Sequence, residues 1–401
     1  MTAATRPDVD LLDPELYRTD PHETWAWMRA NEPLYRDERN GLWAVTRHAD
    51  VLEVERRSDV FSSARGYRSW WAPEENSIIA QDDPGHVAQR RLVSNRFTPR
   101  AVRGQDDWVD RTVTDLLDAI AAQQRDGTGP VDVVTALAAP LPCRLTARLL
   151  GLPEERWEDV KRWSERLMRI DAAPRDQVAA EQLFEAIGEF AQTVGGVLPD
   201  KQACPMDDLL SVWANTDLHG DGGYGPNRMI HEVGLFIAGG AETTRTVISH
   251  GIRVLADHPD QWEEMAADPE VVPSAVEELI RWVTPLNNFF RTALVDTELG
   301  GRPIAEGDRL ELVYPSANRD EDVFAEPFRF DITRSPNPHV AFGHGTHFCL
   351  GANLARRELQ ALFRQLTRRF EPPVVVTEPD VEANIFARAV RSFEVRLAPR
   401  A

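Results

Sequence analysis

The residue types best suited to chemistry lie in one glycine-rich segment near the C-terminus. It reads Phe342-Gly343-His344-Gly345-Thr346-His347-Phe348-Cys349-Leu350-Gly351, and the residues that follow, 351–359, have the apolar spacing of an amphipathic helix. Glycines permit backbone conformations and close approaches that a Cβ would hinder. We expect the thiol of Cys349, at the positive end of that helix, to ionise readily. Such a thiolate either attacks a substrate or binds a metal, and this segment alone does not decide between the two.

A second unusual feature lies in the middle of residues 227–257, whose spacing predicts one long helix. Gly239 and Gly240 are adjacent there, and Glu242 and Thr243 follow in an otherwise apolar run. Each glycine costs about 1 kcal/mol relative to alanine in a helix interior. Residues that disfavour the surrounding secondary structure are often found at functional sites. The alternative is a kinked packing helix, because a threonine can bond back to the preceding turn.

A third feature is a histidine and an arginine on one helix face. His86 and Arg90 are four residues apart on a helix predicted to begin near Pro84, and they therefore share a face. An imidazole beside a guanidinium suits an anionic group such as a carboxylate or a phosphate. A solvated helix face is the alternative.

Composition excludes several classes of function. The chain has 401 residues and a net charge of −20, which argues against a nucleic-acid partner. No apolar run approaches the roughly 18–20 residues that a membrane span needs, and residues 1–8 lack an apolar signal core. Cys143, Cys204 and Cys349 are too scattered for a disulfide framework, so we expect a cytoplasmic protein.

The elements that must position these residues are mostly helices. The pattern predicts a mainly α protein with minor β-sheets near both ends, and residues 1–401 form one domain because no linker divides them. Helices are expected at 22–30, 48–57, 106–123, 141–150, 154–169, 177–194, 227–257, 271–283 and 351–370, and strands at 42–46, 291–295 and 308–313. Residues 61–82 and 219–226 are expected to be irregular, and a loop as long as the first usually forms a lid or a binding site.

These features occur in the order in which one protein family carries them. The pattern Phe-Gly-x-Gly-x-His-x-Cys-x-Gly-x-x-Leu-Ala-Arg is complete around Cys349, and over residues 8–397 the chain resembles a soluble, bacterial-type cytochrome P450, a haem-thiolate monooxygenase. The resemblance implies the cytochrome P450 fold, a triangular helical prism with haem b between the long distal helix and the helix after the Cys349 segment. It also implies that the haem domain has no fused reductase.

The resemblance also assigns roles to individual residues. Cys349 becomes the proximal ligand of the haem iron, a use in which thiolate promotes O–O cleavage. Four side chains become partners of the two haem propionates, since buried carboxylates need partners: His86, Arg90, Arg291 and His347.

Two further groups match the family pattern. Glu242 and Thr243 match an acid–alcohol pair on the distal helix, where a hydroxyl beside a carboxylate that reaches solvent could order a proton relay. The adjacent glycines would leave room for O₂, although Gly239 stands where the family often has alanine. Three residues match a structural charge network behind the cysteine loop, with no role in the chemistry: Glu278, Arg281 and Arg329.

The implied reaction inserts one atom of O₂ into a C–H bond of a hydrophobic small molecule. Electrons from NADH or NADPH would arrive through separate chains, a ferredoxin and a ferredoxin reductase. We expect an acidic donor to bind two arginine-rich helices on the proximal face. Their arginines are Arg90, Arg91, Arg96, Arg100 and Arg103 in or after one helix, and Arg356, Arg357, Arg364, Arg368 and Arg369 in the other.

The substrate pocket is expected to be apolar or aromatic, with one amide to orient a polar group. Its predicted lining is Trp70, Trp71, Asn287, Phe289 and Phe290. Packing of the two tryptophans onto the core is an equal alternative. The runs 290–293 and 334–339 are most similar to those of sterol- and lipid-oxidising members of the family. A sterol, terpenoid or fatty-acid-like substrate is therefore one hypothesis, and an intermediate of secondary metabolism is the other.

Two hypotheses from other classes remain at this stage. One is a haem-based gas sensor without turnover, although a sensor needs no proton relay. The other is an enzyme with Cys349 as nucleophile and His347 or His339 as base. Sequence alone does not specify the substrate, the position oxidised, the redox partner or the oligomeric state.

Overall fold

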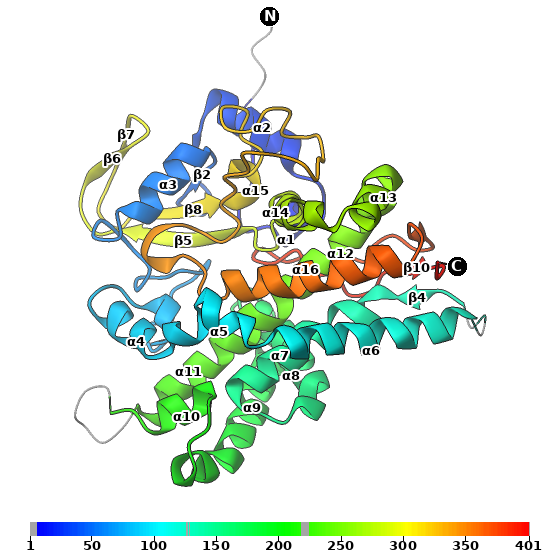
Figure 1. Ribbon diagram of the computed structural model, residues 1–401. Coiled ribbons are helices and arrows are strands. Elements are labelled where there is room, and N and C mark those ends of the chain that lie inside the picture. The colour runs from blue at the N-terminus through cyan, green and yellow to red at the C-terminus, as the bar shows by residue number, and fades with distance from the viewer. Residues whose placement is uncertain (1–5, 126, 128, 218–223, 401) are drawn as a thin grey trace, which may run out of the picture.

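The computed structural model describes residues 6–125, 127, 129–217 and 224–400, and the fold is mostly helical with small sheets, as predicted (Figure 1). The loop predicted at 219–226 lies largely outside these residues. The helices are α1 (Pro14–Arg18), α2 (His22–Asn31), α3 (His48–Arg56), α4 (Gly85–Val93), α5 (Pro99–Arg103), α6 (Asp106–Arg125), α7 (Pro140–Leu150), α8 (Trp157–Met168), α9 (Gln177–Ala203), α10 (Leu209–Ala214), α11 (Pro226–Ile237), α12 (Thr243–Ala256), α13 (Pro259–Ala267), α14 (Val272–Val283), α15 (Tyr314–Ala317) and α16 (Ala352–Arg369). None of the described helices is long and apolar enough to cross a membrane.

The largest sheet joins strands from residues 34–62 with strands from residues 288–313. Its five strands lie in the order β1 (Leu34–Asp37), β2 (Leu42–Val45), β8 (Arg309–Val313), β5 (Asn288–Ala293) and β3 (Phe61–Ser62). Strands β2 and β8 pair in parallel, and the other neighbours are antiparallel. Strand β5 begins three residues before the predicted start at 291 and ends two residues before the predicted end at 295.

Two smaller sheets complete the β structure of the described residues. One contains β4 (Val131–Asp132), β10 (Glu394–Arg396) and β9 (Val374–Val375), and the other is the hairpin of β6 (Thr297–Leu299) and β7 (Arg302–Ile304). The segment 61–82 is irregular as predicted, apart from β3 and a 3₁₀ turn at Ile78–Ala80. Helix α9 runs nine residues past its predicted end at 194.

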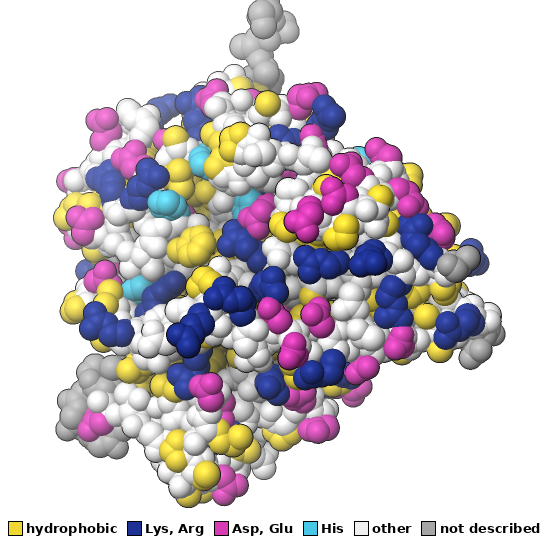
Figure 2. All heavy atoms as spheres, viewed as in Figure 1, with side chains coloured by type: hydrophobic (Ala, Val, Ile, Leu, Met, Phe, Trp, Pro, Cys, Tyr) yellow, Lys and Arg dark blue, Asp and Glu magenta, His cyan; other side chains and the backbone are white. Residues whose placement is uncertain are grey.

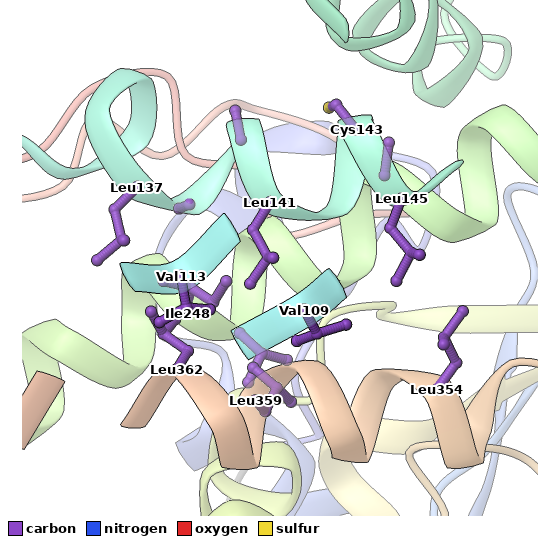
Figure 3. Close-up of a cluster of buried hydrophobic side chains, with 14 of the residues drawn as sticks. Val109, Val113, Leu137, Leu141, Cys143, Leu145, Ile248, Leu354, Leu359 and Leu362 are labelled. Carbon is purple, nitrogen blue, oxygen red and sulfur yellow. The ribbon is translucent and has the colours of Figure 1, made fainter. Parts of the chain in front are cut away.

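The main core lies among α6, α7, α12 and α16. Figure 3 shows leucines of α16 directed toward apolar residues of α6 and of the α7 region, and the labelled side chains include Val109, Val113, Leu141, Leu359 and Leu362. Each is at most 2% exposed, so each contributes on the order of 1.5–3 kcal/mol of burial. This packing holds α16, and therefore the preceding cysteine loop, against the long helix.

The long helix predicted at 227–257 is present but contains a π-helical segment. Helix α11 passes through Ala238–Glu242, which is π-helical, into α12. A Cβ on Gly240 would lie 2.6 Å from the hydroxyl oxygen of Thr146, so this glycine permits the close approach of α7. A Cβ on Gly239 would meet no atom within 4 Å. Of the two glycines, only Gly239 has open space at the position of a Cβ atom. Segments of π-helix are frequent at functional sites.

The charge network behind the cysteine loop is built on two fully buried residues of α14. Glu278 and Arg281 have no exposed side-chain surface, and their charged atoms lie 2.7 Å apart. The guanidinium of Arg281 also donates to the carbonyls of Asn318 and Pro327. These contacts join α14 to the segment that leads to the cysteine loop.

The prediction that Arg329 belongs to this network is wrong. Its side chain is 63% exposed and pairs with Glu326 at the surface. The third member is Arg334, whose Nε lies 3.1 Å from Glu278 and whose Nη2 donates to the backbone carbonyl of Arg329. The chain folds back after Arg329, so that the backbone N–H of Asp331 also donates to Glu278. This return places residue 334 rather than residue 329 beside the buried carboxylate.

This arrangement predicts a difference between two similar substitutions. Arg334→Met should lower the free energy of unfolding by about 3 kcal/mol, because it removes a cation from a buried carboxylate. Arg329→Met should change it by no more than about 0.5 kcal/mol, as expected at an exposed site. Urea unfolding of both variants measures this, and equal losses would contradict the assignment.

Candidate active site around Cys349

The loop that carries Cys349 is shaped by contact with α3. Gly343 and Gly345 have φ values of +67° and +66°, in the left-handed region. A Cβ on Gly345 would collide with the backbone oxygen of Glu55. The N–H of Cys349 donates to the carbonyl of Phe342 at 2.8 Å, which closes the loop. Glycine is required here because no side chain fits between the loop and α3.

Cys349 and the π-helical segment both keep accessible surface, and we infer that a cleft lies between them. Burial nevertheless raises the pKa of the Cys349 thiol. The N–H of Gly351, the guanidinium groups of Arg90 and Arg356 and the N–H of Ala352 oppose that rise. The expectation that the thiol ionises readily is therefore wrong for the chain alone, because burial outweighs the helix terminus. A thiolate at this position is therefore stable only beside a cation that offsets the cost of burying its charge.

The four predicted anion-binding side chains come together beside Cys349. The rings of His86 and His347 lie 4.3 Å apart between centroids. Arg90, on α4, donates to the carbonyl of Phe348 at 2.5 Å. Burial, together with the nearby charges of Arg291, His86 and Arg90, lowers the pKa of His347 to about 2. Three separate segments thus place these four groups in one cluster.

This cluster has too few anions of its own. Among the described residues, its ion pairs with carboxylates are His86 with Asp83 at 3.2 Å and Arg291 with Glu55 at 3.9 Å. The Nε2 atom of His86 is buried and has no hydrogen-bond partner within the described part of the chain. Because buried polar groups are nearly always paired, the cluster is suited to a ligand that brings carboxylates.

The opposite wall of the cleft is the π-helical segment. Gly239 and Gly240 are exposed although they lie in the middle of the long helix. Thr243 is partly exposed, and its hydroxyl donates to the carbonyl of Gly239 at 2.8 Å. A small molecule in the cleft can therefore reach the Thr243 hydroxyl.

Glu242 does not reach solvent directly, which corrects the predicted geometry. It is 1% exposed, and its Oε1 accepts a hydrogen bond of 2.5 Å from Arg245. Burial raises the pKa of Glu242, and the charge of Arg245 opposes that rise. The other Oε atom has no partner among the described residues.

A chain of charges connects Glu242 with the surface. Arg245 also donates to Glu165 on α8 at 2.6 Å, and Lys161 donates to the same oxygen at 2.7 Å. The Glu165 side chain is 31% exposed. An arginine does not give up its proton in proteins, so Arg245 orients the two carboxylates rather than carrying a proton itself.

Only one of the five predicted pocket residues lies in the apolar cluster beside the π segment. Phe289 packs there with Ala238, and its ring is 5.2 Å from that of Phe386. Trp71 is 54% exposed, and its indole donates to the carbonyl of Ala64. Trp71 is therefore at the surface, so that neither the pocket prediction nor the alternative of packing onto the core holds for it.

The other three predicted pocket residues have structural roles. Phe290 points to the opposite face of β5 from Phe289, into the N-terminal core cluster, because side chains alternate along a strand. The amide of Asn287 donates to the carbonyls of Asn384 and Ile385, so these donors are not available to a ligand. The indole of Trp70 donates to the carbonyl of Ile170.

Sequence reasoning missed three further members of this apolar cluster. They come from the end of α8 and from the C-terminal segment: Met168, Phe386 and Ala387. No periodicity or motif marks them in the sequence, because Met168 ends a helix and the other two lie in an irregular segment.

Comparisons with known proteins agree with this geometry. A family model described as Cytochrome P450 matches residues 175–390. The steroid C26-monooxygenase of Mycolicibacterium smegmatis is 39% identical over 91% of this chain and 89% of its own length. The chain belongs to the cytochrome P450 family. It is accordingly a monooxygenase that uses haem b, O₂ and electrons derived from NAD(P)H to oxidise a hydrophobic compound.

Other relatives of this cytochrome P450 are also matched over nearly their whole length. The linalool 8-monooxygenase of Pseudomonas putida is 32% identical over 98% of this chain and 99% of its own length. The structure of Mycobacterium marinum cytochrome P450 CYP268A2 with pseudoionone has a TM-score of 0.87 at 33% identity, covering 98% of this chain and all of that one. That of CYP109E1 from Bacillus megaterium with testosterone has a TM-score of 0.84 at 28% identity, covering 94% and 98%.

The site of this cytochrome P450 fits haem. The cation cluster and the orphaned Nε2 of His86 are suited to the two propionates. Cys349 and Gly239 present accessible surface on the two walls between which a flat group would lie. Iron bound to the sulfur would also explain how a buried thiol can be ionised, because a bound metal deprotonates a coordinating thiol.

The cation cluster predicts how firmly haem is held. Arg291→Met should increase the rate at which haem is lost to excess apomyoglobin by about tenfold or more, because it leaves a buried propionate without a charge-assisted hydrogen bond. Arg57→Met, which removes a half-exposed arginine paired with Glu53, serves as the control and should leave that rate unchanged. Equal rates in the two variants would remove Arg291 from the site.

Proposed function

We propose that residues 1–401 form a single haem domain that hydroxylates a C–H bond of a sterol- or terpenoid-like lipid in the cytoplasm. The observation that carries this proposal is the apolar cluster that joins Ala238 of the π segment to Leu286, Phe289 and Phe386, and which offers mostly hydrocarbon surface to a substrate. The steroid, linalool, pseudoionone and testosterone named for its relatives are all largely apolar.

In this proposal the Cys349 thiolate would bind the haem iron, and four side chains would hold the propionates: His86, Arg90, Arg291 and His347. Bound haem supplies the activation of O₂, promoted by the thiolate. The protein excludes water, positions the C–H bond and supplies protons. His347 offers a ring N–H to a propionate as a hydrogen-bond donor.

Proton delivery is assigned to Thr243 and Glu242. The Thr243 hydroxyl, which donates to the carbonyl of Gly239, keeps its lone pairs free to accept a hydrogen bond and so to position a proton-carrying water molecule. Glu242 exchanges protons with solvent on the side where Arg245 and the partly exposed Glu165 connect it to the surface. In this proposal Thr243 acts in the last step of proton delivery, and Glu242 is the separate group that replaces the proton consumed.

The assignment of Thr243 predicts the effect of removing its hydroxyl. Thr243→Val should lower the product formed per NAD(P)H consumed by about tenfold or more, with hydrogen peroxide accounting for the difference, because general acid catalysis contributes at least this much. The control is Thr244→Val, which removes a neighbouring hydroxyl that is buried. Unchanged coupling in Thr243→Val would contradict the relay.

The substrate class is tested by spectral titration of the ferric protein. Steroids such as testosterone, terpenoids such as linalool, fatty acids and aromatic acids are compared, followed by product analysis for those that bind. Tight binding and oxidation of steroids or terpenoids support the proposal. A preference for a polar aromatic acid would favour an intermediate of secondary metabolism instead.

We also propose that a ferredoxin, reduced by a ferredoxin reductase, docks on the arginines of α4, α5 and α16. Figure 2 shows basic side chains gathered over these elements. Four predicted members are already paired with carboxylates: Arg96, Arg356, Arg357 and Arg369. Arg90 faces the cleft. The docking surface is therefore reduced to five arginines, which form no ion pair among the described residues: Arg91, Arg100, Arg103, Arg364 and Arg368.

This surface predicts an effect of charge on electron transfer. The triple variant Arg91→Glu, Arg100→Glu and Arg103→Glu should slow the second-order reduction by an acidic ferredoxin at least about tenfold at low salt, because charge steers the encounter. The difference should shrink at high salt. Arg302→Glu, an exposed change on the hairpin β6–β7, is the control. Equal slowing by both would show an effect of net charge alone.

A further inference from the structure

Glu55 is a buried carboxyl group that the proposed mechanism does not use. It lies near the end of α3, and its side chain is 2% exposed. Its Oε1 accepts a hydrogen bond of 2.7 Å from the hydroxyl of Tyr314. Its Oε2 is buried and has no partner within the described part of the chain. A buried carboxylate with an unpaired oxygen is costly, so these surroundings favour the protonated form of Glu55.

The cation nearest to this carboxyl is held loosely. Nη2 of Arg291 lies 3.9 Å from Oε1 of Glu55, which is too long for a hydrogen bond. Nη1 of Arg291 donates to the carbonyl of Phe290 at 2.8 Å. The guanidinium therefore keeps donors for a stronger acceptor than Glu55, and a haem propionate is such an acceptor.

The elements packed around the carboxyl leave Arg291 as its main opposing charge. Three groups from three elements face it: Arg291 on β5, Tyr314 on α15 and the N–H of His344 in the Cys349 loop. The rings of the loop histidines are turned elsewhere, His344 to Arg56 and His347 to His86. Strand β6 packs beside α3 through Arg57, which donates to Thr297.

These contacts do not offset burial. Burial raises the pKa of Glu55 to about 7, although Arg291, Tyr314 and His344 oppose that rise. A propionate bound to Arg291 would bring a second carboxylate to the same cation. When two carboxylates share one site, the pKa of one of them rises further. The proton goes to Glu55, because a proton on its unpaired Oε2 makes that atom a hydrogen-bond donor.

We propose that Glu55 is a proton-binding positioning residue of the haem site, which takes up a proton when haem binds and so leaves Arg291 to the propionate. The same uptake accompanies reduction of the iron, because the added electron, supplied by the redox partner, makes the site more negative. The proton comes from solvent, and the only bond formed is the O–H bond of Glu55. The inference rests on the proposed role of Arg291 toward a propionate and not on the substrate class.

The direction of the pH dependence follows from these two states. Glu55 has a pKa of about 7 without haem, and a higher one with haem in place. Its contribution to haem affinity is therefore fully present below about pH 7 and is lost as the pH rises through the higher value. Haem should thus be held less firmly, and the ferric form should be favoured over the ferrous form, on the alkaline side.

The rate of haem loss to excess apomyoglobin tests this linkage. In the wild type the rate should rise about tenfold from pH 7 to pH 9, as a pKa shift of about one unit requires. Glu55→Gln keeps the shape of the side chain and an acceptor for Tyr314 but does not titrate, so most of this rise should disappear. Glu53→Gln makes the same change at a half-exposed site on the same helix and should keep the wild-type rise. The same rise in Glu55→Gln as in the wild type would overturn the proposal.

A second variant separates titration of Glu55 from a merely structural role. The Tyr314 hydroxyl lowers the pKa of Glu55, so Tyr314→Phe should move the rise in haem loss to higher pH. A rise at the wild-type pH in this variant would contradict the role of Glu55. The outcome for Arg291→Met identifies which step fails. If that variant also leaves haem loss unchanged, the propionate assignment fails, whereas faster loss there with a wild-type pH profile in Glu55→Gln overturns the role of Glu55 alone.

Two measurements on the holoenzyme address the coupling to reduction. The reduction potential of the iron should fall with rising pH in the wild type and less steeply in Glu55→Gln, and equal slopes would overturn this coupling. Infrared difference spectra of the reduced and oxidised wild type near pH 8 should contain the C=O stretch of a newly protonated carboxyl group. That band should be absent from Glu55→Gln and present in Glu53→Gln, and its persistence in Glu55→Gln would assign the proton to another group.

Discussion

The active site depends on one close contact, that of the Cys349 loop with the end of α3. Gly345 lies against the backbone oxygen of Glu55, and the carboxyl of the same residue accepts a hydrogen bond from Tyr314 and faces Arg291. Burial raises the pKa of Glu55 to about 7. One residue of α3 thus fixes the loop that bears the thiol and joins it to the strand that bears the main buried cation.

The two walls of the cleft are made in different ways. The thiol wall is a loop held by glycines and by the packing of α16 into the main core. The distal wall is a helix whose π segment exposes Gly239 and turns Thr243 toward the cleft. Charge follows the same division, with cations beside Cys349 and the Glu242–Arg245 pair behind the distal helix. A flat dianionic group between these walls satisfies both.

The outer part of the pocket is organised by polar contacts rather than by apolar packing alone. Asn287 and Asn384 hold the C-terminal segment, and Arg68, Asp171 and Arg309 join residues 68–69 to β8 and to the connection after α8. These groups leave the surface near the π segment to aromatic and aliphatic side chains. This explains how a chain with a net charge of −20 forms an apolar substrate site.

Sequence by itself determined the chemistry and most of the helices. Cys349, the weakened helix around Gly239 and the ordered motifs were enough to identify the family, because ligand type and local backbone demands are written in single residues and short spacings. Most helix ends and the long helix were also predictable from periodicity, although α9 runs nine residues past its predicted end. The replacement of Arg329 by Arg334 was not, because it depends on how an irregular segment folds back on a buried carboxylate.

Tertiary structure alone decided which side chains face the pocket. Phe289 and Phe290 are neighbours of the same type in the sequence, and only the pairing of β5 within the sheet places them on opposite faces. Phe386 and Asp171 carry no local signal, since both contact Arg68, which is more than 100 residues away from each of them. Long-range packing sets such contacts, and no short pattern records them.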